Sequence, residues 1–246
     1  MGRDTDLDRL VERFGLGPGA RERLDRLVTV VLDHSAAPTS IRSRSAVVAN
    51  HIADSLVAVE LPALRSARTM TDIGSGAGFP GLVLAIANSE AQVSLVESNG
   101  RKCHFLTEAV EEARIGNATV VNARVEEWSA GIGANDVVTA RAVAGLDVVA
   151  EYAAPLLRVG GVLIAWRGRR DGEEEAAAAR AAAVLGLEPE PPRHVSPYRE
   201  AEHRHLHVFR KIGETPARFP RRPGIPRKYP LGNASPPRAN GAPRRT

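Results

Sequence analysis

The sequence predicts an α/β fold in three parts: a helical N-terminal cap, a mostly parallel seven-stranded sheet flanked by helices, and a flexible basic C-terminal tail. From residue 67 onward, short apolar runs alternate with amphipathic segments, as expected for a parallel sheet joined by crossover helices. Before that point apolar residues recur at helical spacing. After residue 212 the chain is rich in Pro and Arg. We therefore divide it into a cap over 1–66, a domain over 67–212 and a tail over 213–246.

The cap is expected to contain three helices. Apolar residues recur every three or four positions from Leu7 to Phe14 and again from Leu24 to Leu32, and this period is typical of a helix with one buried face. A third helix is expected over residues 45–64. Together these helices are expected to form the N-terminal cap.

The domain is expected to alternate strands with helices. Ligands of such sheets bind outside the carboxyl ends of the strands, where the strand order reverses. The first strand is followed at once by a glycine-rich turn, which places that turn at the expected ligand site. The expected strands are 67–74, 92–97, 118–123, 136–141, 160–167, a segment near 192–198, and 203–212, and the expected helices are 80–88, 100–115, 146–157 and 171–185.

Positive charge is concentrated near the C-terminus. Residues 210–246 contain ten Lys and Arg against one acidic residue, Glu214, whereas the formal charge of the whole chain is only +4. Eight prolines fall in the same stretch. A segment of this composition does not bury a core by itself. We expect a basic arm that contacts nucleic acid, with a merely solubilising tail as the alternative.

The remaining bulk features predict a cytoplasmic monomer without a membrane partner. No apolar run approaches the ~20 residues that a membrane span needs, and the charged N-terminus lacks the apolar core of a signal peptide. The single cysteine, Cys103, agrees with a reducing compartment. His203, His205 and His207 alternate along a strand, but the sequence places no further ligand beside them, so we predict no metal site.

The stretch TDIGSGAGFPGL, residues 71–82, indicates which ligand the turn accepts. A dinucleotide fingerprint would need its third glycine where Phe79 stands, and no Gly-Lys-Ser/Thr follows as a phosphate-binding loop requires. The pattern that remains is acidic-x-Gly-x-Gly-x-Gly, the usual loop of S-adenosylmethionine-dependent methyltransferases. We therefore predict a Rossmann-like class I methyltransferase fold. The candidate cofactor contacts in this stretch are Asp72, Gly74, Gly76, Gly78 and Phe79.

Two further segments extend the candidate cofactor site. Glu97 ends the second expected strand, where a carboxylate can accept hydrogen bonds from both ribose hydroxyls of a nucleoside. Its alternative is a solvated loop carboxylate. Val125 and Glu126 follow the third strand and are candidates for the surroundings of the adenine ring, although a surface turn with a buried valine explains them equally well.

Several segments together resemble the glucose-inhibited division protein B family, bacterial methyltransferases of guanine N7 in 16S (small-subunit) ribosomal RNA. They are HIADSL, TDIGSGAGFPGLVLAIA, LVESNGRKCHFL, ARVEEW, DVVTARAVA and the closing EHRHLHVFRK with RFPRRPGIPRKYPL. The resemblance implies that Gly74, Phe79, Val125, Glu126 and Arg141 contact S-adenosylmethionine. The segment AAPTSIRSR, residues 36–44, departs from the family pattern.

The residues themselves are compatible with this chemistry. Guanine N7 has an in-plane lone pair and no proton to lose, so its methylation needs positioning rather than a general base. The turn after the fourth strand lacks the Pro-Pro-aromatic pattern used for exocyclic amines, and Cys103 has no evident role as a nucleophile. Arg141 is the candidate catalytic residue, acting by positioning through guanine O6 or the cofactor carboxylate. A surface ion pair is its alternative.

Basic residues near the expected site are candidates for phosphate contacts, which give affinity without base specificity. Two other functions stay open: a non-catalytic RNA-binding ribosome assembly factor, and a methyltransferase with a small-molecule or protein substrate. A nicotinamide-dependent oxidoreductase ranks last because of Phe79. The candidate RNA contacts are Arg101, Lys102, Arg124, Arg221, Arg222, Arg227 and Lys228, and the expected partner is 16S ribosomal RNA or the small ribosomal subunit.

Overall fold

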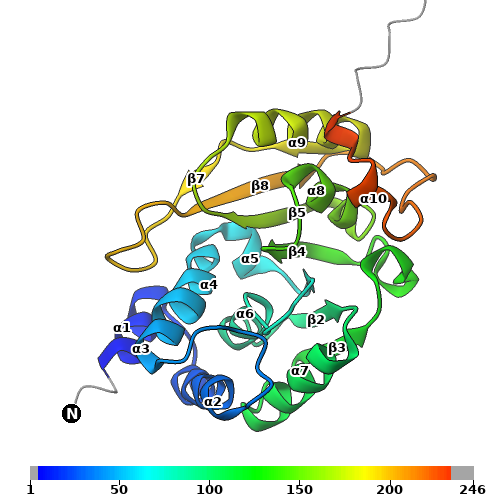
Figure 1. Ribbon diagram of the computed structural model, residues 1–246. Helices are drawn as coiled ribbons and strands as arrows, with labels where there is room; N and C mark the ends of the chain where they lie inside the picture. Colours follow the sequence, from blue (N-terminus) through cyan, green and yellow to red (C-terminus); the bar gives the residue numbers. More distant parts are fainter. Residues whose placement is uncertain (1–4, 234–246) are drawn as a thin grey trace, which may run out of the picture.

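The computed structural model describes residues 5–233, which form one twisted sheet between two helical layers (Figure 1). The strand order is β3-β2-β1-β4-β5-β8-β6, with β7 also beside β8. Strands β1 to β5 are parallel, and β8 runs antiparallel to β5. The predicted α/β class is therefore confirmed. The strands are β1 (Thr69–Ile73), β2 (Gln92–Glu97), β3 (Ala118–Asn122), β4 (Asn135–Arg141), β5 (Leu157–Arg167), β6 (Leu187–Pro189), β7 (Arg193–His194) and β8 (His205–Lys211).

The sheet has eight strands rather than the predicted seven. Both β6 and β7 pair with β8, β6 through Leu187 opposite Lys211 and β7 through Arg193 opposite Leu206. Between them lie Pro191 and Pro192, which have no N–H to donate to a ladder. The strand expected near 192–198 corresponds to β7, and β6, on the other side of the two prolines, is the strand that the sequence did not predict.

The central strands are buried on both faces, because successive side chains point to opposite sides of the sheet. Val137 of β4 joins one apolar core and Val138 joins the other. The first core lies under the cap helices, α6 (Gly81–Ala87) and α7 (Gly100–Glu112). The second lies under α8 (Leu146–Ala153) and α9 (Gly172–Leu185). Strands with both faces covered explain the continuous apolar runs in the sequence.

The cap begins with α1 (Thr5–Phe14) and α2 (Ala20–Asp33) and shares its core with the sheet. The stretch predicted as one helix over 45–64 is helical over nearly its whole length, but it is not one uniform α-helix. This stretch changes helical type several times, and its second part is a π-helical segment that carries His51. Segments of this kind occur often at functional sites. The parts are α3 (Arg44–Val47), η1 (Val48–Ala53, π-helical), α4 (Asp54–Leu56), η2 (Val57–Glu60, 3₁₀) and α5 (Pro62–Ser66).

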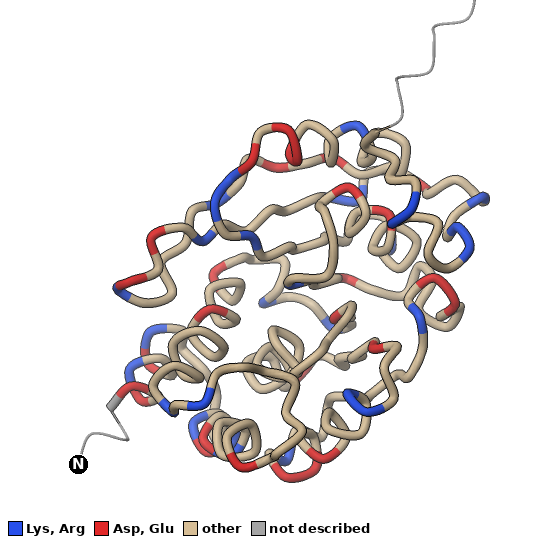
Figure 2. The backbone as a smooth tube through the Cα atoms, viewed as in Figure 1, with Lys and Arg blue, Asp and Glu red and all other residues tan. Residues whose placement is uncertain are grey.

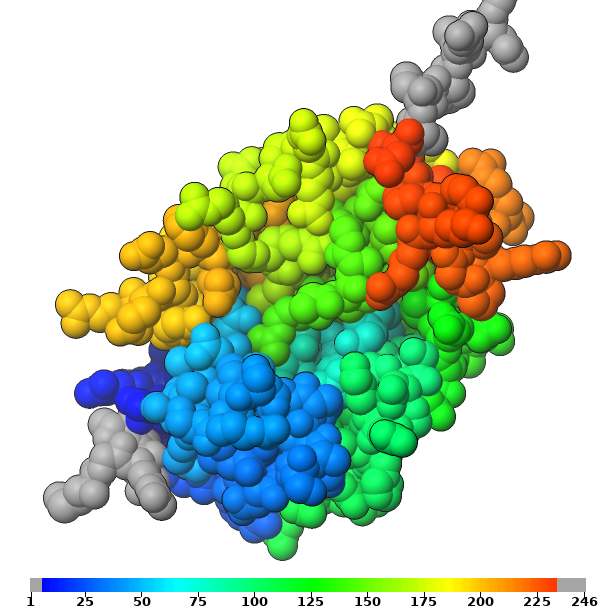
Figure 3. Space-filling view, in the orientation of Figure 1, coloured from blue at the N-terminus to red at the C-terminus, as the bar shows by residue number. Residues whose placement is uncertain are grey.

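The C-terminal segment is packed onto the domain as far as residue 233, so the expected flexible tail is wrong over 213–233. It contains α10 (Ile225–Lys228) and η5 (Leu231–Asn233), which contact α8 and α9. Phe219, Pro226 and Gly232 are buried. In Figure 3 the orange and red surface of this segment lies directly against the green surface of the middle of the chain. The last part of the predicted tail, 234–246, lies outside the described residues.

Two short 3₁₀ turns, η3 (Val125–Glu127) and η4 (Ser129–Gly131), follow β3. Among residues 5–233, no helix combines the length and the apolarity that crossing a bilayer requires.

Candidate active site

The glycine-rich turn lies at the carboxyl end of β1, as predicted, and its backbone requires glycine. Gly74, Gly76 and Gly78 have φ angles of +66°, +57° and +87°, a region that other L-residues adopt only at a cost. A Cβ on Gly74 would lie 2.9 Å from Val143 Cγ2, and one on Gly78 would lie 2.2 Å from Leu82 Cδ1. The turn therefore combines a left-handed backbone with close packing behind it.

Asp72 lies behind this turn. Asp72 is only 1% exposed, and its Oδ1 accepts a hydrogen bond of 2.8 Å from Thr139 Oγ1 of β4. A Cβ on Gly81 would come within 2.8 Å of the other carboxylate oxygen. Burial raises the pKa of Asp72 to about 6. The carboxylate thus ties β1 to β4 beneath the turn.

Glu97 ends β2 and fixes the turn from the other side. Its Oε2 accepts from Gly76 N at 3.1 Å and its Oε1 accepts from Asn99 N at 2.8 Å. Each carboxylate oxygen has a second lone pair. Glu97 therefore has acceptor capacity beyond these two backbone bonds, next to the pocket described below.

A pocket of about 330 Å³ opens beside the turn, and we name it the glycine-loop pocket. It is lined by residues of the turn, η3, the segment after β4, α8 and α10. Sequence reasoning identified Gly74, Val125 and Glu126 here and missed Tyr152, which is 70 to 80 positions from the turn and carries no motif. Burial raises the pKa of the Tyr152 hydroxyl. The main lining residues of the glycine-loop pocket are Gly74, Val125, Glu126, Val143, Tyr152 and Arg227.

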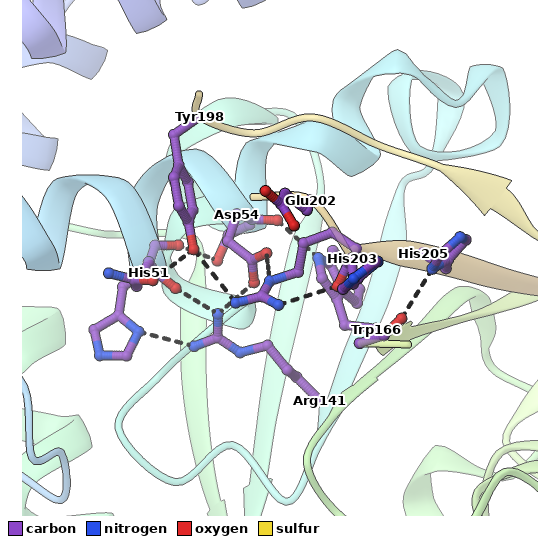
Figure 4. Close-up of polar contacts among 12 residues, drawn as sticks. His51, Asp54, Arg141, Trp166, Tyr198, Glu202, His203 and His205 are labelled. Atoms are coloured by element: carbon purple, nitrogen blue, oxygen red, sulfur yellow. Dashed lines mark hydrogen bonds and ion pairs between the residues drawn. The ribbon is translucent and has the colours of Figure 1, made fainter. Parts of the chain in front are cut away.

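A second pocket, of about 560 Å³, lies between the cap and the ends of β4 and β5, and we name it the His51 pocket. Its polar side chains converge around Asp54 (Figure 4). The main lining residues are Asn50, His51, Asp54, Arg141, Trp166 and Arg204.

Arg141 is the centre of the polar contacts in the His51 pocket. Its guanidinium donates to Asp54 Oδ2 at 2.9 Å and to the Asn50 carbonyl at 3.1 Å, and lies 3.1 Å from His51 Nδ1 (Figure 4). Arg204 Nε lies 3.3 Å from the other Asp54 oxygen. One nearly buried carboxylate therefore holds two arginines at the pocket wall, which restricts both guanidinium groups.

His51 connects this network to the glycine-rich turn. Its ring stacks on Phe79, with ring centroids 4.3 Å apart and planes inclined by 12°, and its Nε2 lies 2.9 Å from Thr39 Oγ1. Burial and the nearby Arg141 lower the pKa of His51 to about 4, so the ring is neutral at pH 7. Phe79 is buried beneath His51 and does not line the glycine-loop pocket.

Two more contacts fix the walls of the His51 pocket. Trp166 Nε1 donates to the Asp54 carbonyl at 2.7 Å, and Tyr198 Oη donates to Asn50 Oδ1 at 2.6 Å. Sequence reasoning did not assign Asn50, Asp54, Tyr198 or Arg204 to a site. A usable signal existed, because HIADSL places a histidine and an aspartate inside an otherwise apolar helical pattern.

The predicted RNA contacts lie in different surroundings. Arg101 and Lys102 begin α7, and Arg124 is exposed at the glycine-loop pocket. Figure 2 shows basic positions near the start of α7 and along the C-terminal segment, both on the right-hand side of the view. Arg222 and Lys228 are exposed. Arg221 and Arg227 differ, because both bind the protein itself: Arg221 pairs with Glu151, and Arg227 donates to the Val143 carbonyl at 2.8 Å.

The fold and the glycine-rich turn define a class of protein, the Rossmann-like S-adenosylmethionine-dependent methyltransferases. Among solved structures, fibrillarin, a pre-rRNA processing protein of Methanococcus jannaschii, shares the fold with a TM-score of 0.51 at 16% identity. The match covers 63% of this chain and 70% of fibrillarin. S-adenosylmethionine is the cofactor of this class.

Residues 23–205 match the GidB family, described as rRNA small subunit methyltransferase G, and the chain belongs to this family. A protein of that description from Chloroflexus aggregans is 44% identical over 198 residues, which cover 78% of this chain and 82% of the relative. Another, from Rubrobacter xylanophilus, is 42% identical over 197 residues, which cover 77% of this chain and 75% of the relative. The predicted family and the predicted methyltransferase activity are confirmed.

Proposed function

We propose that this protein transfers a methyl group from S-adenosylmethionine to N7 of a guanine in 16S ribosomal RNA. One observation carries the proposal: the two pockets meet at the turn after β4. Arg141 and Ala142 line the His51 pocket, and the next residue, Val143, lines the glycine-loop pocket. A donor in one pocket and an acceptor base in the other would approach each other across this turn. Such proximity supplies much of the acceleration of a transfer reaction.

The glycine-loop pocket fits the cofactor. S-adenosylmethionine supplies a methyl group on a positively charged sulfur. Val125 and Glu126 would border the adenine ring, and the spare lone pairs of Glu97 would accept from the ribose hydroxyls. The backbone at Gly74 and Gly76 would adjoin the amino acid part, because neither residue has a side chain in the way. Asp72, Gly78 and Phe79 would act indirectly, by holding the turn in place.

The His51 pocket fits a base that needs no proton removed. A neutral His51 with a pKa of about 4 is a poor proton acceptor at pH 7, and Asp54 is engaged by two arginines. Guanine N7 attacks with its own lone pair, so neither group has to take a proton. Arg141 would serve as a positioning residue, since its contacts to Asn50, His51 and Asp54 fix the wall against which the base would lie.

The RNA would be held by exposed cations around the pockets. Arg101, Lys102, Arg124, Arg222 and Lys228 would contact phosphates, and these contacts would make binding salt-dependent. We further propose that the protein works as a monomer, because residues of one chain line both pockets, and that it works in the cytoplasm, where its proposed RNA substrate would be found.

Methylation of 16S ribosomal RNA and of small subunits from a strain lacking this protein tests the proposal. With methyl-labelled S-adenosylmethionine, label should appear as N7-methylguanine at one position in at least one of the two substrates. Label in neither, with S-adenosylhomocysteine still bound by the protein, would indicate a non-RNA substrate. Absence of cofactor binding would indicate an RNA-binding assembly factor instead.

A further inference from the structure

Residues 219–232, which we name the C-terminal strap, cross the outer side of the glycine-loop pocket. The strap contacts η3, the turn after β4 together with the adjoining α8, and α9, which are three separate parts of the sequence. Its end is fixed where Arg180 Nε donates to the Gly232 carbonyl at 2.8 Å. A Cβ on Gly232 would lie 2.6 Å from both Ala177 Cβ and Asp147 Oδ2. The strap is therefore packed closely on the domain at this end.

A nearly buried ion pair fixes the beginning of the strap. Arg221 binds both carboxylate oxygens of Glu151 of α8, at 2.6 and 2.5 Å. Glu151 is only 1% exposed. The same guanidinium donates to the Tyr229 carbonyl at 2.9 Å. Bidentate pairing of this kind fixes orientation as well as position, so Arg221 holds both the strap and its internal fold.

Between these two ends, the strap binds residues of the glycine-loop pocket directly. Gly224 N donates to Glu126 Oε1 at 3.1 Å, and Arg227 donates to the Val143 carbonyl at 2.8 Å. Glu126, Val143 and Arg227 itself all line the pocket. The Arg227 side chain is thus held at the pocket wall while its residue remains exposed on the outer side.

We propose that the C-terminal strap is the outer wall of the cofactor pocket and that Arg227 packs against the bound adenosyl group. This inference rests on the proposed cofactor role of the glycine-loop pocket. A guanidinium is planar and weakly hydrated, which suits it to contact with an aromatic ring system. The strap also fixes the Glu126 carboxylate through Gly224. It gives Arg227 a role in cofactor binding in place of the phosphate contact expected from the sequence.

Calorimetric titration with S-adenosylhomocysteine tests the strap. Arg227→Gln should raise the Kd about tenfold, the effect of losing one charged contact of ~1.4 kcal/mol. Arg222→Gln and Lys228→Gln are matched controls, because each removes one exposed charge from the same segment and neither residue lines the pocket. Both controls should stay within about twofold of the wild type.

Binding of 16S RNA by the same variants tests the alternative, that Arg227 contacts RNA rather than the cofactor. If Arg227 serves RNA instead, Arg227→Gln weakens 16S RNA binding as the two controls do and leaves the Kd for S-adenosylhomocysteine unchanged, which overturns the inference. If the wild type itself gives no heat with S-adenosylhomocysteine, the proposed function fails, and the two failures are thereby distinguished.

A second variant releases the strap without leaving a buried charge unpaired. The double variant Glu151→Gln, Arg221→Gln should also raise the Kd for S-adenosylhomocysteine, by about tenfold or more, while retaining a cooperative thermal transition. Limited proteolysis should then cut within 213–233 faster than in the wild type. An unchanged Kd together with faster proteolysis would contradict a role of the strap in cofactor binding.

Discussion

His51 and Phe79 stack with their ring planes only 12° apart, which joins the cap to the glycine-rich turn. His51 belongs to the π-helical segment η1, and Phe79 belongs to the turn after β1. The pair lies between the two pockets, since His51 lines one and Phe79 supports the turn that borders the other. The geometry of the His51 pocket thus depends on a residue of the glycine-rich turn.

Removal of the His51 ring should slow methyl transfer without weakening cofactor binding. His51→Ala removes the stack and the contacts to Arg141 and Thr39, and a poorly positioned base can cost about 100-fold in kcat. His51→Phe keeps a ring on Phe79 and should lose less. The Kd for S-adenosylhomocysteine should stay within about twofold. His104→Ala, at an exposed histidine of α7, is the control, and an equal loss in that variant would contradict the prediction.

Arg141→Met should destabilise the fold, because it removes one of the two cations on the nearly buried Asp54. Breaking a buried pair from one side costs about 3 kcal/mol, and Arg204 remains to offset part of that cost. Urea unfolding measures the change. The double variant Arg141→Met, Asp54→Asn should lose less than the sum of the two single variants. Strict additivity would show that the two residues do not interact.

The sequence predicted those parts of the fold that depend on local pattern. β2 lies at 92–97 as expected, because its apolar run is bounded by turns and both faces are buried. The glycine-rich turn was recognisable since its positive φ angles favour glycine. Predicted helices on both faces followed from the alternation of elements.

The parts that the sequence did not predict depend on contacts between distant residues. The strap is held by Arg221 and Glu151, which are 70 positions apart, and nothing near either residue indicates the other. A Pro-rich, basic composition suggested a free tail, whereas contacts to distant residues, among them the buried Glu151 carboxylate, dock it on the domain. Likewise, the change from α- to π-helix around His51 accompanies its packing on Phe79, which helical periodicity does not reveal.

Gly74→Ala should weaken cofactor binding about tenfold. A Cβ at this position would lie 2.9 Å from Val143 Cγ2, and φ is +66°, a conformation that costs a non-glycine residue ~1–2 kcal/mol. Either the turn or Val143 must move, and both border the glycine-loop pocket. Gly100→Ala is the matched control, because its nearest neighbour would be Asn122 Oδ1 at 3.9 Å. Calorimetry with S-adenosylhomocysteine gives both Kd values, and equal values for the two variants would contradict the prediction.

The lowered pKa of His51 makes the stability of the protein depend on pH. The folded-state pKa is about 4, against an ordinary value of 6.5. Between these values the unfolded chain binds a proton at His51 that the folded protein does not, so the contribution of His51 to the free energy of unfolding falls as the pH drops from 6.5 to 4. The contribution is about 2 kcal/mol over this range. Urea unfolding at pH 7, 6 and 5 measures the dependence.

In His51→Gln this part of the pH dependence should disappear, because glutamine does not titrate. The variant should therefore lose less stability than the wild type between pH 7 and 5, whatever its stability at pH 7. His104→Gln again serves as the control and should retain the wild-type dependence, since His104 lies at the surface. If His51→Gln and the wild type lose stability in parallel over this range, His51 is not the group that takes up the proton on unfolding.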